Sequence, residues 1–122
     1  MLSVKINKLD HSIGNKKILN NINLELEKDK IACILGPSGC GKTTLLKLIA
    51  GLFKVEKGEI LLDNELVSSN NIHVKTEKRK IGFLFQDYAL FPHQTVKENL
   101  QFAIRDKSSS HTIEEILDVI KL

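Results

Sequence analysis

The chain has 122 residues, of which 42% are hydrophobic and 27% are charged, an ordinary balance for a globular domain. Its formal net charge of +3 is small and dispersed, so we expect no nucleic-acid partner. No apolar run approaches the roughly 18 residues that span a bilayer, and residues 1–5 do not begin a signal peptide, so any membrane role should be peripheral. Cys33 and Cys40 have no His or Cys at metal-ligand spacing, which predicts two reduced thiols of a cytoplasmic protein.

Alternating apolar residues predict two strands at the start of the chain. Leu2, Val4 and Ile6 alternate with polar residues, which indicates a half-exposed strand. Residues 11–17 contain a Gly-Asn pair and predict a turn. Residues 18–26 alternate again, so we expect a second strand antiparallel to the first.

An apolar strand, a glycine-rich turn and a helix are predicted next. After a turn at residues 28–30, the unbroken apolar run 31–35 predicts a central strand that is covered on both faces. Residues 36–44 read Gly-Pro-Ser-Gly-Cys-Gly-Lys-Thr-Thr, and a helix is expected over residues 41–52, ending near Gly51. The pattern G-x-x-x-x-G-K-[ST] has a physical meaning in this strand–turn–helix context.

That pattern predicts a site for a nucleoside triphosphate. Its glycines permit backbone conformations in which successive N–H groups turn inward around an anion, and the helix N-terminus adds the positive end of its dipole. Lys42 can reach the β- and γ-phosphates, and the Thr43 hydroxyl can ligate Mg²⁺. The alternative, a glycine-rich turn that binds nothing, leaves Lys42 without an obvious packing role.

The middle of the chain predicts a hairpin and two connections. Residues 59–67 have the pattern of a β-hairpin that turns at Asp63 and Asn64. The same run superficially resembles a metal-ligating strand, because acids come after an apolar stretch, but its position soon after the glycine-rich turn favours the hairpin. Residues 68–71 predict a polar loop, and the largely basic residues 73–80 predict a solvated connection.

A further strand and two helices complete the prediction. Residues 80–86 are apolar and aromatic, which predicts a strand. Thr95 and Glu98 have capping-box spacing and predict a helix through about Ala103. Residues 112–115 repeat that spacing before a last helix, whose apolar stripe is Ile113, Ile116, Leu117 and Ile120. With antiparallel strands early and parallel strands later, the expected fold class is α/β.

Beyond the glycine-rich turn, the chain resembles the ATP-binding-cassette (ABC) proteins. Residues 36–46 match the family's phosphate loop (Walker A), residues 49–60 resemble the segment after that loop in the family, and residues 85–99 resemble the Q-loop and the next helix. Residues 77–82 are similar to the importer branch, which serves periplasmic binding proteins. The resemblance covers the chain end to end and implies the N-terminal portion of a transporter ATPase subunit.

The resemblance also implies an architecture. It is a P-loop NTPase core with an N-terminal antiparallel β subdomain, truncated before the signature motif and the Walker B strand. Residues 1–30 would form the antiparallel β portion, residues 31–94 the core with the Q-loop, and residues 95–122 the start of a helical subdomain.

Family membership would assign roles to individual residues. Gln86 would approach the metal and the attacking water, for which an uncharged amide that donates and accepts is suited. Ile13 stands where the family has an adenine-stacking aromatic, so its contact with the base should be weaker. His11 nearby is either a substitute base contact or an exposed turn residue. The implied catalytic residues are Lys42 and Gln86, the metal ligands are Thr43 and Gln86, and the nucleotide-binding residues are Ile13, Gly36, Pro37, Ser38, Gly39, Cys40, Gly41, Lys42, Thr43 and Thr44.

The resemblance implies ATP and Mg²⁺ as cofactors and a place on the inner face of the cell membrane. Expected partners are a second nucleotide-binding subunit, transmembrane permease subunits and, indirectly, a solute-binding protein. Aromatic and apolar residues near the Q-loop would line or support the groove for the permease: Phe83, Phe85, Tyr88, Leu90 and Phe91.

Turnover needs parts that the resemblance does not include. After Gly82 the chain has no glycine, so the family's glycine-containing signature is absent, together with the Asp-Glu strand and the switch histidine. We therefore expect the chain to bind ATP without hydrolysing it. A non-catalytic nucleotide-binding or docking fragment, and another P-loop NTPase or kinase, stay as alternatives. The transported solute is not encoded in these residues.

Overall fold

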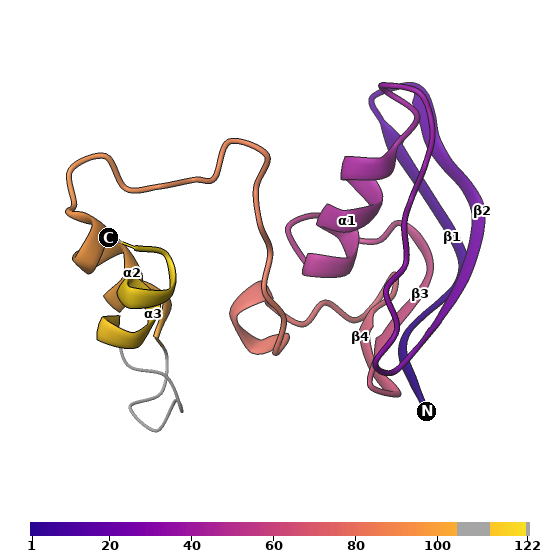
Figure 1. The fold of residues 1–122 in the computed structure, drawn as a ribbon. Coiled ribbons are helices and arrows are strands. Elements are labelled where there is room, and N and C mark those ends of the chain that lie inside the picture. The colour runs from indigo at the N-terminus through magenta and orange to yellow at the C-terminus, as the bar shows by residue number, and fades with distance from the viewer. Residues whose placement is uncertain (105–112, 122) are drawn as a thin grey trace. The chain divides into compact units, whose positions relative to one another are not determined.

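The computed structural model describes residues 1–104 and 113–121. The chain forms two compact units, Met1–Phe83 and Leu84–Leu122, whose elements are shown in Figure 1. In the described ranges, no helix is long and apolar enough to cross a membrane.

An antiparallel sheet forms most of the first unit. Its four strands within residues 1–83 are β1 (Leu2–Ile13), β2 (Lys16–Glu27), β3 (Lys57–Leu62) and β4 (Glu65–Ser68), in the spatial order β2-β1-β3-β4. Every neighbouring pair is antiparallel, as the alternation near the N-terminus predicted for β1 and β2. The first turn is tighter than predicted, because His11, Ser12 and Ile13 still pair with β2 and only two residues remain between the strands.

The predicted hairpin at residues 59–67 is confirmed as β3 and β4. Asp63 and Asn64 form the two-residue turn with φ values of 47° and 66°. Two consecutive positive φ angles are typical of a type I′ turn, whose twist matches the right-handed twist of a hairpin. Apart from glycine, Asn and Asp are the residues that best tolerate a positive φ. Asp63 is therefore a turn residue, and the alternative of a metal-ligating strand is not supported.

The helix predicted after the glycine-rich turn is α1 (Lys42–Ala50). Gly51 ends it with a φ of 82°, donating its N–H to the Leu48 carbonyl, while the Leu52 N–H reaches the Lys47 carbonyl at 2.9 Å. This pair of bonds is a Schellman motif, in which a left-handed glycine satisfies the last carbonyls of a helix. The predicted end near Gly51 is confirmed.

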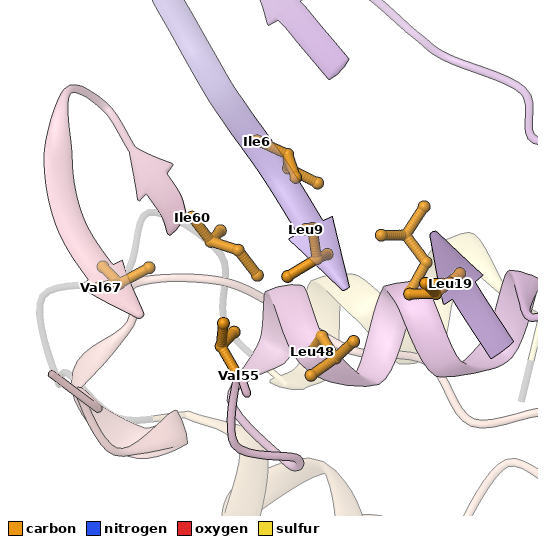
Figure 2. Packing of buried hydrophobic residues seen from close by; sticks show 8 residues of the cluster. Ile6, Leu9, Leu19, Leu48, Val55, Ile60 and Val67 are labelled. Atoms are coloured by element: carbon orange, nitrogen blue, oxygen red, sulfur yellow. The ribbon is translucent and has the colours of Figure 1, made fainter. Parts of the chain in front are cut away.

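The core of the first unit lies between α1 and the sheet. Figure 2 shows Leu48 of α1 among side chains from β1 and β3, with Ile6, Leu9 and Ile60 directed toward the helix. These four side chains have exposed fractions of 1% or less. The buried cluster as a whole consists of Ile6, Leu9, Leu19, Leu45, Leu48, Val55, Ile60 and Val67.

Two predicted strands are not formed. Residues 30–37 and 80–85 have no regular secondary structure, and Ile31, Leu35 and Leu84 are 95%, 89% and 80% exposed. A strand that is covered on both faces needs a hydrogen-bonded neighbour and a layer on each side. Within the described residues no β-strand pairs with either run, so neither run forms a strand.

The prediction of a solvated connection over residues 73–80 is also wrong in part. This segment contains the short 3₁₀ helix η1 (Thr76–Lys78), and His73 forms an isolated β-bridge with Ser68. Arg79 in the same segment is only 3% exposed. The basic composition suggested solvent, because charged residues are rarely buried. Arg79 is the exception, because its hydrogen bonds are supplied by backbone carbonyls and a hydroxyl.

The second unit contains α2 (Val96–Ala103) and α3 (Ile113–Val119). The predicted capping box at α2 is confirmed: the Glu98 N–H donates to Thr95 Oγ1 at 3.2 Å, and the Thr95 N–H donates to Glu98 Oε2 at 2.7 Å. The second predicted capping box begins at Thr112, which lies outside the described residues.

Candidate nucleotide-binding site

The phosphate loop, residues 36–41, runs into the N-terminus of α1 through two left-handed glycines. Gly39 and Gly41 have φ values of 79° and 100°. The Cys40 N–H donates to the Pro37 carbonyl at 3.3 Å, which closes a tight turn within the loop. A residue with a Cβ is strained in this region, so the two glycines let the chain reverse direction immediately before the helix.

Gly41 also allows the loop to pack closely on β2. A Cβ at this position would lie 2.8 Å from Ile18 Cγ2 and 2.9 Å from Leu19 Cδ2. Any larger residue would push the start of α1 away from the sheet. The loop is therefore seated against the first residues of β2, close to the turn that joins β1 to β2.

The N-terminus of α1 is suited to an anion. No side chain caps it, and its first turn contains no acidic residue. The first helical hydrogen bond comes from the Leu45 N–H to the Gly41 carbonyl at 2.9 Å, so the N–H groups of the preceding helical residues have no intrahelical acceptor. Unpaired N–H groups and the positive end of the dipole together favour a phosphate at such a position.

Lys42 brings a positive charge to the loop. Its Nζ donates to the carbonyls of Gly36 and, at 2.9 Å, of Pro37, and it lies 3.7 Å from Cys40 Sγ. The side chain thus folds back over the loop that precedes it. An ammonium held at this loop can neutralise the charge of a bound phosphate.

Thr43 is the exposed first-turn hydroxyl of α1. In the described ranges, no group of three or more His, Cys, Asp or Glu side chains could hold a metal ion. Mg²⁺ is commonly held by few protein ligands, together with waters and the phosphates of a nucleotide. The donor set around Thr43 therefore fits a metal that binds with a nucleotide, and it does not fit an independent metal site.

Lys42 and Thr43 at the start of α1 and the phosphate loop before them lie together in the first unit. Ile13 lies in the same unit, at the end of β1, and its side chain is 54% exposed. Gln86 lies in the second unit, where it is exposed and begins a turn in which the Tyr88 N–H donates to the Phe85 carbonyl at 3.0 Å. Gln86 thus follows residues 80–85, which were predicted as part of a strand and have no regular secondary structure.

Both interpretations of His11 are wrong. His11 is 8% exposed, and its ring stacks on Phe53 with 5.8 Å between centroids and 9° between planes. Its Nδ1 lies 3.8 Å from Glu56 Oε1. The Phe53 ring also contacts the Lys47 ammonium, 5.4 Å from its centroid. His11 is therefore neither a turn residue nor available to a base, and its regular alternation with Leu9 in β1 was the signal that could have indicated burial.

An apolar groove lies beside α2 in the second unit. Its volume is about 300 Å³, and the Gln94 Oε1 atom within its lining is buried without a hydrogen-bond partner in the described structure. Leu90 and Phe91, two of the five residues that the sequence placed near the expected permease groove, line this groove beside α2. The lining residues are Leu90, Phe91, Pro92, Gln94, Val96, Asn99 and Leu100.

Comparisons with known proteins show the family to which this chain is related. A family model described as "ABC transporter" matches residues 19–122. A spermidine/putrescine import ATP-binding protein of Pasteurella multocida is 44% identical over 102 residues, which are 84% of this chain and 26% of that protein. A sulfate/thiosulfate import ATP-binding protein of Pectobacterium atrosepticum is 37% identical over an alignment of 130 positions, which covers 99% of this chain and 38% of that protein.

Among solved structures, a dimeric ATP-binding cassette in a post-hydrolysis state with ADP and Pi has a TM-score of 0.68 and 32% identity to this chain. The match covers 92% of this chain and 51% of that one, so the fold is that of the N-terminal part of an ABC ATPase domain. The chain spans between 26% and 38% of the length of the two curated relatives. Because the family model matches most of its residues, the chain belongs to the ABC transporter family.

Proposed function

We propose that this chain binds MgATP through residues 36–44 as part of the ATPase subunit of an importer. The observation that carries the proposal is the phosphate loop itself. Two left-handed glycines precede an uncapped helix N-terminus, and the Lys42 ammonium lies over the loop within 2.9 Å of the Pro37 carbonyl. Such an arrangement supplies N–H donors and one positive charge, which is what a chain of phosphates requires.

Each site residue has a role in this proposal. The N–H groups of the loop and of the first turn of α1 would hold the phosphates, and Lys42 would offset the charge of the β- and γ-phosphates. Thr43 and Gln86 would be ligands of Mg²⁺, and Gln86 would also orient water. Ile13 would pack on the adenine with its exposed aliphatic side chain. Bound Mg²⁺ would supply further neutralisation of the phosphate charge.

The import function and its partners are inferred from the relatives. Their names identify import ATP-binding proteins for spermidine/putrescine and for sulfate/thiosulfate, which leaves the solute of this chain open between classes. The similar solved cassette is a dimer, which supports a second nucleotide-binding subunit. We assign the groove beside α2 to a permease subunit, which would place the chain on the inner face of the membrane and link it indirectly to a solute-binding protein.

Nucleotide binding is tested by titrating the 122-residue chain with MgATP and measuring Kd by calorimetry. Replacing Lys42 with Ala should weaken binding about 10-fold or more, because a hydrogen bond to a charged group is worth about 1.5–3 kcal/mol. Lys30→Ala is the matched control, since it removes the same charge from an exposed residue outside the site. Wild-type chain that does not bind MgATP, or a Lys42→Ala variant that binds as tightly as the control, would contradict the proposal.

A further inference from the structure

Arg79 is buried against the C-terminal end of α1, the helix whose N-terminus carries the phosphate loop. Its side chain is almost fully covered, with 3% of the residue exposed. Nη1 donates to the carbonyls of Leu48 and Ile49 at 3.1 and 2.9 Å. Both carbonyls belong to the last turn of the helix, and the Leu48 carbonyl also accepts the Gly51 N–H.

The Nη2 and Nε atoms of Arg79 donate to β4 and to the segment that follows β4. Nη2 donates to the Val67 carbonyl at 3.1 Å and to Ser68 Oγ at 2.7 Å, both in β4. Nε donates to the Val74 carbonyl at 2.7 Å. All five N–H groups of Arg79 therefore have acceptors, and the side chain joins α1, β4 and the connection after β4.

The positive charge of Arg79 is balanced by a helix and not by an acid. Among the residues that the structure describes, its acceptors are carbonyls and one hydroxyl, with no carboxylate in the group. The C-terminal end of a helix carries partial negative charge, which favours a cation there. Gly51 makes the approach possible, because a Cβ at that position would lie 2.5 Å from Arg79 Nε.

Lysine cannot replace this arrangement. Its ammonium has three donors on one atom, whereas the guanidinium presents five donors in a fixed planar fork. The acceptors of Arg79 lie on three separate segments, so only the fork reaches all of them. The geometry therefore depends on the shape of the side chain as well as on its charge.

Restraint at one end of α1 is transmitted to the other, because the helix is short. It has nine residues, which span only about 13 Å at the usual rise per residue. Its N-terminal end is set by the close packing of Gly41 on β2, and its middle is set by Leu45 in the core. Without Arg79, the C-terminal end would keep its glycine cap and lose its connection to β4.

We propose that Arg79 is a positioning residue for nucleotide binding: it holds α1 against the sheet so that the phosphate loop keeps the geometry that a triphosphate requires. This inference rests on the proposed function of the same loop. It assigns no contact between Arg79 and nucleotide, because Arg79 acts only through the helix.

The test compares Arg79→Lys and Arg79→Met with Lys78→Met, a control that removes an exposed charge next to Arg79 in the sequence. Measurements are made at a temperature at which circular dichroism shows each variant to be folded. Both Arg79 variants should bind MgATP and inorganic tripolyphosphate about 10-fold or more weakly than the control, since small displacements of a binding group have effects of this size. Full rescue by Arg79→Lys would overturn the proposal, because charge alone would then suffice.

A second readout does not depend on nucleotide. In ligand-free protein, the backbone amide resonances of Gly39 and Gly41 should shift in both Arg79 variants and stay at wild-type positions in the control. Ser68→Ala, which removes one of the five acceptors, should shift them in the same direction by a smaller amount. If Arg79→Met does not fold, Ser68→Ala still tests whether Arg79 positions the phosphate loop. Loop resonances unchanged in folded Arg79→Lys and Ser68→Ala would overturn the proposal.

The two proposals can fail separately. Wild-type chain that binds neither MgATP nor tripolyphosphate would contradict the proposed function, and the amide resonances alone would then decide whether Arg79 positions the loop. Wild-type binding together with unchanged affinity and unchanged loop resonances in the Arg79 variants would contradict the positioning role only.

Discussion

Leu46 and Leu48 lie on different faces of α1, and only Leu48 belongs to the core. Leu48 is 0% exposed, whereas Leu46 is 45% exposed. We predict that Leu48→Ala lowers the free energy of unfolding of the first unit by about 2–5 kcal/mol, because a cavity replaces a fully packed side chain. Leu46→Ala, the control on the same helix, should change it by about 0.5 kcal/mol or less. Urea unfolding measures both, and equal losses would show that the helix packs through a different face.

His73 should make the first unit sensitive to acid. Burial lowers the pKa of His73, and the nearby charges of Arg79 and Lys54 lower it further. A histidine whose folded pKa lies below its unfolded value of about 6.5 favours the neutral form in the folded state. Its contribution to stability is therefore complete above about pH 6.5 and is lost as the pH falls through the lowered folded pKa.

The check is urea unfolding of wild type and His73→Asn between neutral and mildly acidic pH. The wild-type free energy of unfolding should fall over this range, and the variant should have a smaller slope because it has lost the titrating group. His93→Gln, in the second unit, should keep the wild-type slope. A His73→Asn variant with the full wild-type pH dependence would show that another group is responsible.

At the level of elements, α2 begins at a complete capping box. Thr95→Ala removes a side chain that accepts from the Glu98 N–H, and we predict that it destabilises α2 by about 1 kcal/mol. Hydrogen exchange of the α2 amides measures this, with Gln101→Ala as a control at an exposed position of the same helix. Equal exchange rates in the two variants would mean that the cap contributes nothing in solution.

The stability that the capping box gives to α2 should depend on pH through the Glu98 carboxylate. The N–H of Thr95, together with the Thr95 hydroxyl, holds the pKa of Glu98 below its usual range. A carboxylate with a lowered folded pKa stabilises the structure above its ordinary pKa, and this contribution is lost as the pH falls through the lowered value. Protection of the α2 amides should decrease in that acidic range, and Glu98→Gln should remove the dependence.

At the level of the whole molecule, nucleotide binding and nucleotide hydrolysis are separate predictions for this chain. The phosphate loop and first turn of α1 contain no acidic residue that could act as a base. We predict that the chain binds MgATP and does not turn it over. A multiple-turnover phosphate-release assay tests this, and release at about 1 s⁻¹ or faster, typical of enzymes, that Lys42→Ala abolishes would refute the prediction.

Features with short-range causes were predictable from the sequence. The alternation of β1 and β2, the turn at Asp63 and Asn64, and the capping box at Thr95 each depend on residues within a few positions of one another. The phosphate loop belongs to the same class, because its glycines, Lys42 and the helix N-terminus are contiguous. The role proposed for Gln86 comes from family resemblance alone, because no local pattern defines it.

Features that depend on distant neighbours were not predictable. The run 31–35 was expected to be a central strand because its apolar residues suit one, but hydrophobicity does not provide a hydrogen-bonding neighbour, and none pairs with it among the described residues. His11 is buried because Phe53, far along the chain, stacks on its ring. These outcomes depend on pairing and packing across the sheet.

The phosphate loop is specified by local sequence, because a run of nine residues contains the glycines, the lysine and the hydroxyl that a triphosphate site requires. The way in which that loop is held became visible only in the folded chain. Arg79 was predicted to be in solvent because of its charge, and it is buried because the carbonyls of α1, β4 and Val74 converge on one guanidinium. The local sequence therefore specifies the chemistry of the loop. The position of the loop depends on the hydrogen-bond acceptors of Arg79, which come together only when α1 packs on the sheet.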